Sequence, residues 1–297
     1  MSDRTIIHRV FGPFRALVPR RFRRGLPVVP VVRLAGVIGF STPLRPGLTI
    51  ASIARSLERA FTWRGASAVA LVINSPGGSA VQSHLIFQRI RQLAEEHTRP
   101  VFAFVEDVAG SGGYMIACAA DEIVCDASSI LGSIGVVGSS FGFTGLIEKL
   151  GIERRLHTSG EHKAMLDPFL PEKADDVERL KEIQHDIHKG FIDLVKSRRG
   201  TALTGPADTL FSGEYWAGSK AVELGLADHL GDLRSTLRKR FGAEVVTPLI
   251  TAERGFLGRR IPGIGGGRFA DESLSVGFAD EILSALEARA LWSRFGL

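Results

Sequence analysis

The fold of this 297-residue chain is decided by residues 66–79, which read Ala-Ser-Ala-Val-Ala-Leu-Val-Ile-Asn-Ser-Pro-Gly-Gly-Ser. The first eight residues form an almost continuous apolar run, which is typical of a strand buried on both faces of a parallel sheet. The last six form a turn, and a helical pattern follows at 81–96. A buried strand that leads through a glycine turn into a helix indicates an α/β fold.

A second unit of the same kind follows. Residues 101–108 form another apolar run, 109–113 a glycine turn, and 112–120 a helix. With a β-rich run at 28–39 and a helix at 50–63, the order βαβαβ predicts right-handed crossovers and a mainly parallel sheet with flanking helices. Active sites in such sheets lie at the carboxyl ends of the strands, so both glycine turns are expected there.

The rest of the chain predicts a basic N-terminal segment at 1–27, a folded domain at 28–250 and a C-terminal part at 251–297. Further elements are expected, namely a strand at 122–125, helices at 171–199, 212–224 and 233–241, a strand at 244–250, a glycine-rich linker at 255–267 and an amphipathic helix at 280–295.

The formal charge of +5 is concentrated at the N-terminus. Residues 1–25 carry seven arginines and one acid, whereas the remainder carries 30 basic and 31 acidic residues. This nearly neutral body argues against a nucleic-acid partner. Phe11, Phe14 and Phe22 among the arginines fit an anionic membrane surface, although an unstructured basic tail fits equally. No apolar run is long enough for a membrane span, so we expect a cytoplasmic protein, peripheral at the inner face of the membrane if the segment binds there.

Ser111, in Ala-Gly-Ser-Gly-Gly-Tyr at 109–114, is a candidate nucleophile. It lies between a buried strand and a helix N-terminus, where the positive end of the helix would stabilise an alkoxide or oxyanion. A simple N-cap serine fits the same position. The N–H groups of the other turn, at Gly77 and Gly78, would form half an oxyanion hole or belong to an ordinary tight turn.

A nucleophilic serine needs a base. His162 and Lys163 follow each other in Thr-Ser-Gly-Glu-His-Lys, but no acid completes a Ser-His-Asp pattern. A lysine can serve where burial lowers its pKa, although most lysines lie on the surface. The glycine-rich run 132–138 lacks a nucleotide fingerprint and suits a substrate groove, in which Ser133 could orient an uncharged lysine.

Four motifs together resemble the signal peptide peptidase A and protease IV group, which includes SohB-like proteins. The motifs are Asn74–Gly78, Gly110–Tyr114, Gly132–Gly138 and Ser159–Lys163. The resemblance covers residues 28–250 and implies a ClpP/crotonase-like fold and a serine endopeptidase with a Ser/Lys dyad. It would cleave unfolded or membrane-derived, signal-peptide-like peptides, without a metal or other cofactor.

The resemblance also implies roles for individual residues. Ser111 would be the nucleophile, Lys163 the general base, and Ser133 the residue that holds the lysine amine. The N–H groups of Gly78 and Ser111 would form the oxyanion hole. The substrate would contact Gly77, Gly112, Val136 and Val137. Family members assemble into rings, so a homo-oligomeric ring is expected.

Two other functions stay open at this point. A crotonase-like acyl-CoA enzyme would share the sheet and the paired N–H groups, but it would not need the serine and lysine. A catalytically silent oligomeric scaffold would share only the fold.

Overall fold

The computed structural model describes residues 25–39, 47–160, 162–251, 289–290 and 292–293. Strands in this part form one seven-stranded sheet, in which five follow the order β1-β2-β3-β4-β7. These are β1 (Val31–Ala35), β2 (Val69–Ser75), β3 (Val101–Gly110), β4 (Glu122–Cys125) and β7 (His229–Leu230). All their pairings are parallel, as is that of β5 (Ile130–Gly132) with β3, whereas β6 (Tyr215–Ala217) runs antiparallel to β5. The predicted α/β fold with a mainly parallel sheet is confirmed.

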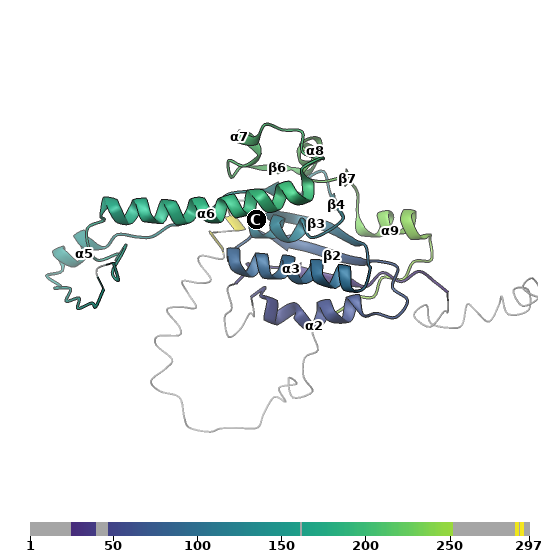
Figure 1. The fold of residues 1–297 in the computed structure, drawn as a ribbon, viewed down its shortest axis with the longest axis horizontal. Helices are drawn as coiled ribbons and strands as arrows, with labels where there is room; N and C mark the ends of the chain where they lie inside the picture. The colour runs from purple at the N-terminus through teal and green to yellow at the C-terminus, as the bar shows by residue number, and fades with distance from the viewer. Residues whose placement is uncertain (1–24, 40–46, 161, 252–288, 291, 294–297) are drawn as a thin grey trace, which may run out of the picture.

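Helices lie on both faces of the sheet (Figure 1). In chain order they are α2 (Ile50–Phe61), α3 (Ala80–Glu96), α4 (Gly112–Ala117), α5 (Thr144–Lys149), α6 (Ala174–Arg199), α7 (Ala207–Leu210), α8 (Gly218–Glu223) and α9 (Leu233–Phe241). The start of α2 is fixed by a capping box, in which Thr49 Oγ1 accepts from the Ser52 N–H and Ser52 Oγ accepts from the Thr49 N–H.

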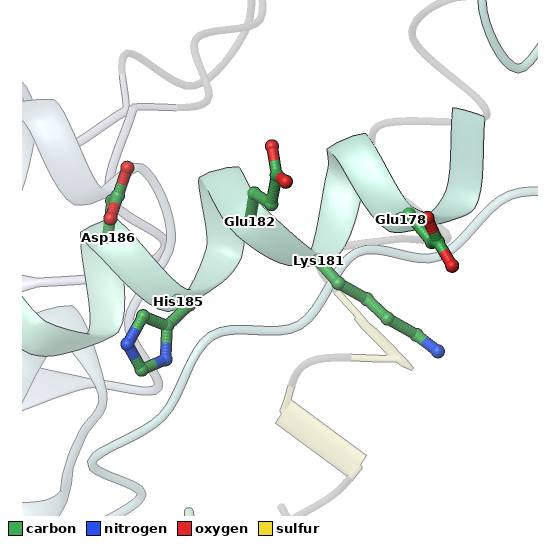
Figure 2. A pocket seen from close by; sticks show the side chains of 5 residues that line it. All are labelled: Glu178, Lys181, Glu182, His185 and Asp186. Carbon is green, nitrogen blue, oxygen red and sulfur yellow. The ribbon is translucent and has the colours of Figure 1, made fainter. Parts of the chain in front are cut away.

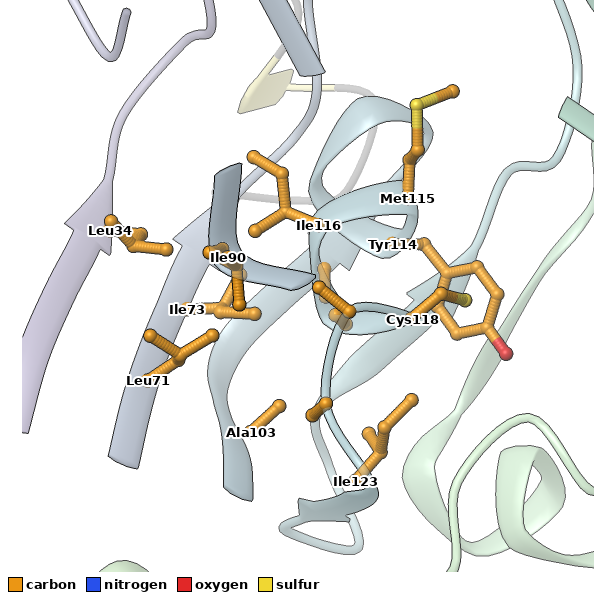
Figure 3. Close-up of a cluster of buried hydrophobic side chains, with 14 of the residues drawn as sticks. Leu34, Leu71, Ile73, Ile90, Ala103, Tyr114, Met115, Ile116, Cys118 and Ile123 are labelled. Carbon is orange, nitrogen blue, oxygen red and sulfur yellow. The ribbon is translucent and has the colours of Figure 1, made fainter. Parts of the chain in front are cut away.

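The core consists of two apolar layers, one on each face of the sheet. Leu71 and Ile73 of β2 lie in the same layer as Ile90 of α3 and Ile116 of α4 (Figure 3). Leu57 of α2 belongs to the same cluster. Ala70 and Val72 face the other side, where Leu237 of α9 covers them. Because both faces are covered, every residue of β2 is buried, which explains its continuous apolar sequence.

Two predicted elements differ from the structure. The helix expected at 212–224 is wrong in its first half, which forms β6, and only α8 is helical. Trp216 on β6 packs on Gly132, where a Cβ would lie 2.8 Å from the ring. That contact requires the chain to lie extended beside β5. The strand expected at 244–250 makes only isolated bridges, from Val246 and Leu249 to the first strand region.

Several predictions concern residues outside the described ranges. They include nearly all of the basic segment 1–27, the linker 255–267 and most of the helix 280–295. The domain limits 28–250 therefore stay a prediction.

Residues 136–190, here named the projection, extend away from the sheet (Figure 1). The projection comprises α5, the segments beside it and the outer part of α6. None of its described residues is buried. The buried residues of α6 are Phe191, Val195 and Arg199, all near its inner end. The projection therefore has no core of its own. It is attached mainly through α6 to the part of the described domain that carries the sheet, residues 25–39, 47–135 and 191–251, here named the body.

Candidate active site

Ser111 occupies a strained position directly after β3, at the N-cap of α4. Its φ of 50° and ψ of −118° lie where non-glycine residues are rarely found. Such a conformation costs on the order of 1–3 kcal/mol, and it recurs at functional sites. The half-buried side chain makes no capping hydrogen bond. A strained serine at a strand-to-helix turn is the geometry that presents a nucleophilic hydroxyl at the edge of a sheet.

The turn after β2 lies against this serine. A Cβ on Gly77 would lie 2.8 Å from Ser111 Cβ and 3.0 Å from the Gly112 nitrogen. The φ of Gly77 is +106°, in the region that favours glycine. Only glycine fits at this position without displacing the serine, so the two glycine turns meet as the sequence predicts.

The direction of the Gly78 N–H follows from its neighbours. Ile38 donates to the Gly77 carbonyl and accepts from the Ser79 N–H, both at 2.8 Å. In a parallel pairing of this kind, the residue between the two bonded neighbours points its own N–H away from the partner strand. Since β3 lies on the opposite side of β2 from β1, the Gly78 N–H points toward the Ser111 side. Gly78 is also exposed.

Gly112 supplies a second amide donor beside Ser111. It is the first residue of α4, and N–H groups in the first turn of a helix have no intrahelical acceptor. Its N–H has no hydrogen-bond acceptor among the described residues. A Cβ on Gly112 would lie 2.1 Å from Ser83 Oγ, so a side chain is excluded.

The N–H of Ser111 is occupied. It donates to the Gly132 carbonyl at 2.8 Å, where β3 pairs with β5. Its expected part in an oxyanion hole therefore does not fit this structure. The signal that sequence reasoning missed is positional: the residue after the serine, Gly112, begins the helix and keeps a free N–H.

Ser133 lies close to this edge, immediately after Gly132. Ser133 is buried, with 6% exposure, and its φ of 52° again lies in the left-handed region. The backbone N–H donates to the Glu214 carbonyl, but Ser133 Oγ has no hydrogen-bond partner in the described ranges. Half-buried Val136 and exposed Val137 follow it.

Lys163 is not brought to Ser111 within one chain. It is exposed and lies in the projection, where nearby Leu166 donates its N–H to Asp176 Oδ2 near the outer end of α6. The first α6 side chain seen to bond the body is His188, whose Nε2 lies 3.0 Å from the Ile134 carbonyl oxygen. Twelve residues of helix separate Asp176 from His188, or roughly 18 Å along the axis.

The segment around Lys163 is itself ordered by contacts inside the projection. Arg154 forms an ion pair with Asp167 at 2.5 Å and lies over the Phe169 ring. The Arg154 guanidinium and the Phe169 N–H hold the pKa of the Asp167 carboxyl below its ordinary value. Phe143 also packs against Phe169. Lys163 therefore lies in a segment of the projection that an ion pair and aromatic contacts hold in place.

A hollow along the outer part of α6 does not join this site. Its lining residues are Glu178, Lys181, Glu182, His185 and Asp186, all on α6 (Figure 2). Among the residues that the structure describes, no group of three or more His, Cys, Asp or Glu side chains could hold a metal ion. Nor, in those ranges, is any helix long and apolar enough to cross a bilayer.

Comparison with known proteins gives a family match. The model of peptidase family S49 matches residues 94–243. A protein of Brucella abortus named Na(+)/H(+) antiporter NhaA is 54% identical over 289 residues, which are 96% of this chain and 39% of that protein. The chloroplastic serine protease SPPA of Arabidopsis thaliana is 36% identical over 168 residues, 54% of this chain and 24% of that protein. This chain thus spans less than half the length of either relative.

A solved structure is also similar. It is a mutant of a membrane-bound stomatin-specific protease, with a TM-score of 0.43 and 17% sequence identity, covering 72% of this chain and 85% of that one.

Proposed function

The chain belongs to peptidase family S49, and on that premise we propose that it is a serine endopeptidase in which Ser111 is the nucleophile and Lys163 the general base. The observation that carries the proposal is the strained Ser111, whose hydroxyl makes no capping hydrogen bond and which is followed by Gly112, whose N–H has no acceptor among the described residues. The geometry around Ser111 supports its role, whereas the role of Lys163 rests on the resemblance of Ser159–Lys163 to the family motif.

The reaction would proceed through an acyl-enzyme. The neutral Lys163 amine takes the proton of Ser111 Oγ as this oxygen attacks the peptide carbonyl carbon. The oxyanion of the tetrahedral intermediate accepts hydrogen bonds from the N–H groups of Gly78 and Gly112. The lysine ammonium then protonates the leaving amine as the C–N bond breaks. Lys163 next takes a proton from water, which attacks the ester and releases the acid, and Ser111 recovers its proton.

A second copy of the chain would supply the lysine. Lys163 is exposed on the projection, and the projection leaves large apolar side chains in solvent, including Phe141 at 78% and Leu150 at 63% exposure. Exposed apolar surface of this kind marks an interaction site. We therefore propose a homo-oligomeric ring in which the projection of one copy covers the Ser111 edge of the next.

Docking would also give the lysine the environment of a base. An amine accepts a proton only when it is uncharged, and burial disfavours the charged form. Ser133, buried and with its hydroxyl unpartnered among the described residues, would accept the amine hydrogen bond and orient it. This fits the role that the sequence predicts for Ser133.

The proposed substrates are unfolded or membrane-derived peptides that resemble signal peptides. The Val136 and Val137 side chains, which follow β5 and Ser133, would contact the residue before the scissile bond and favour small or apolar side chains. Gly77 and Gly112 leave room for the peptide backbone beside Ser111.

We also propose that residues 1–27 bind an anionic membrane surface at the inner face. Near such a surface each basic residue contributes about 1 kcal/mol. Deletion of residues 1–27 should release the protein from vesicles that contain anionic phospholipid while peptide hydrolysis is kept. Retained vesicle binding would contradict this role.

Covalent labelling tests the catalytic proposal. A fluorophosphonate should label the wild-type protein at Ser111, and both labelling and peptide hydrolysis should vanish in Ser111→Ala and be lost in Lys163→Ala. Ser128→Ala, which changes an exposed serine, serves as the matched control and should behave as the wild type. Unchanged hydrolysis in Ser111→Ala would contradict the proposal. If the wild type is neither labelled nor hydrolyses peptide, a catalytically silent scaffold is favoured. If calorimetry shows that it binds acyl-CoA, a crotonase-like enzyme is favoured.

A further inference from the structure

Strand β3 contains an irregularity just before Ser111. In its pairing with β2, Ile73 lies opposite Val105, but Ser75 lies opposite Ala109. Three residues of β3 therefore face the single residue Asn74. Two of these three, Glu106 and Asp107, are the exposed residues of an otherwise buried strand. Bulges of this kind bend a strand and redirect the side chains beyond them.

Side chains from three neighbouring segments hold this bulge. Asn74 Nδ2 of β2 donates to Asp107 Oδ2 at 2.5 Å. Ser129 Oγ, in the turn before β5, donates to the Glu106 carbonyl at 2.6 Å. Arg33 of β1 pairs with the Glu106 carboxylate at 2.7 Å. Side chains from β1, from β2 and from the turn before β5 therefore stabilise the bulge.

The Asn74–Asp107 hydrogen bond joins β2 and β3 shortly before each strand leads into its glycine turn of the proposed site. Asn74 stands three residues before Gly77, and Asp107 four residues before Ser111. Asn74 is 9% exposed, and its Oδ1 has no partner among the described residues. Within the described residues, the bond to Asp107 is therefore the one hydrogen bond that the Asn74 side chain makes.

We propose that Asn74 and Asp107 are positioning residues, whose hydrogen bond sets the placement of Ser111 and Gly112 relative to the Gly78 N–H. The inference rests on the proposed peptidase function. Neither side chain is assigned a contact with substrate; each acts through the backbone that follows it. A displacement of about 1 Å in such a constellation can cost about 100-fold in rate. An asparagine suits position 74 because its amide donates to the aspartate, whereas a carboxylate there would repel it.

Three variants test the pair by peptide hydrolysis and fluorophosphonate labelling. Asp107→Ala removes the acceptor from an exposed site, so it leaves no buried cavity. Asn74→Asp places two carboxylates together at nearly constant volume. The reversed pair, Asn74→Asp with Asp107→Asn, restores one donor and one acceptor. Asp208→Ala, at an exposed acid on α7, is the matched control.

The expected result for Asp107→Ala is a fall in kcat of about 10- to 100-fold, with KM within about twofold, since the oxyanion donors act mainly in the transition state. Asn74→Asp should fall at least as far, and the reversed pair should recover about tenfold over it. A purely structural role would lower the melting temperature without this split between kcat and KM.

Each outcome of these measurements either supports or overturns the positioning role of Asn74 and Asp107. Wild-type kcat in Asp107→Ala, or a reversed pair that folds without recovery over Asn74→Asp, overturns the inference and leaves the proposed function intact. If Asn74→Asp does not fold, Asp107→Ala decides alone, and a folded, active reversed pair counts in support. If the wild-type protein neither hydrolyses peptide nor reacts at Ser111, the proposed function fails and this inference fails with it.

Discussion

The body and the projection differ in how they hold the residues of the proposed site. Ser111 follows a strand in which all but two residues are buried, and neighbouring backbone fixes Gly77 and Gly112 around it. Lys163 lies in the projection, where no described residue from 136 to 190 is buried. In the proposed mechanism, the sheet therefore holds the nucleophile and the oxyanion donors within one chain, whereas the proposed base lies on a surface that a second copy would cover.

The largest expected effect comes from separating the two halves. Ser111→Ala and Lys163→Ala should each lower kcat by at least about 1,000-fold, as in other enzymes whose nucleophile and base act as a unit. If the site forms between copies, mixing the two inactive variants in one ring should restore activity to about one quarter of the wild-type sites, because random assembly places an intact Ser111 beside an intact Lys163 that often.

The mixing measurement separates the two arrangements directly. Subunits are denatured, combined in equal amounts and refolded, and hydrolysis is compared with each variant refolded alone. A mixture as inactive as its components would place both residues in the same subunit and remove the comparison between body and projection.

The next effect concerns the surface of the projection. Leu150→Glu puts a charge on a side chain with 63% exposure, so the fold of one chain should survive while the contact between copies is lost. Activity should fall about 100-fold, because a misplaced base loses its positional advantage. Analytical ultracentrifugation should show smaller assemblies.

Leu249→Glu is the matched control, since Leu249 is 58% exposed but belongs to the body. It should keep both the assembly and the activity. Equal behaviour of the two variants would mean that the projection is not the contact surface.

The pH dependence of hydrolysis also distinguishes the groups of the body from those of the projection. The groups proposed for the body half, the Ser111 hydroxyl and two backbone amides, do not titrate near neutrality, whereas the proposed lysine base must lose a proton before it acts. Hydrolysis should therefore rise as pH increases from 6 toward 10, by about tenfold per unit while the ammonium form predominates. Lys163→Arg should stay inactive throughout, because a guanidinium does not give up its proton in this range. A flat wild-type profile would count against a lysine base.

The sequence predicts the body better than the projection for a physical reason. A continuous apolar run such as 66–73, bounded by turn residues, is typical of a strand buried on both faces of a sheet. The glycines of the two turns mark where backbone approaches backbone. The projection has no such internal constraint. The outer part of α6 does carry an apolar stripe at helical spacing, including Ile183 and Ile187, but both are 39% exposed, so the stripe predicts a helix and not where that helix lies. The prediction of a helix at 212–224 was wrong in its first half because the antiparallel pairing of β6 with β5, with the Trp216 ring packed on Gly132, outweighs local propensity.

The same limit applies to the site. Ser111 and the meeting of the two glycine turns follow from strand ends, which sequence patterns locate well. The assignment of the Ser111 N–H does not, because its acceptor, the Gly132 carbonyl, belongs to a short strand that reads as a glycine-rich loop. Sequence reasoning finds which residues reach the edge of the sheet, but the choice of donor depends on long-range pairing.

The smallest expected effect compares one glycine from each region. In Gly113→Ala the new Cβ would lie 2.5 Å from the Ser75 carbonyl oxygen, so backbone must shift. The free energy of unfolding should fall by about 1–3 kcal/mol, after an offset of up to about 1 kcal/mol from the better helix propensity of alanine. In Gly142→Ala, on the projection, nothing lies within 4 Å of the new Cβ, and the change should stay within about 0.5 kcal/mol. Thermal unfolding of both variants measures the difference. Equal losses would show that Gly142 is closely packed in the assembled protein, which the single chain does not provide.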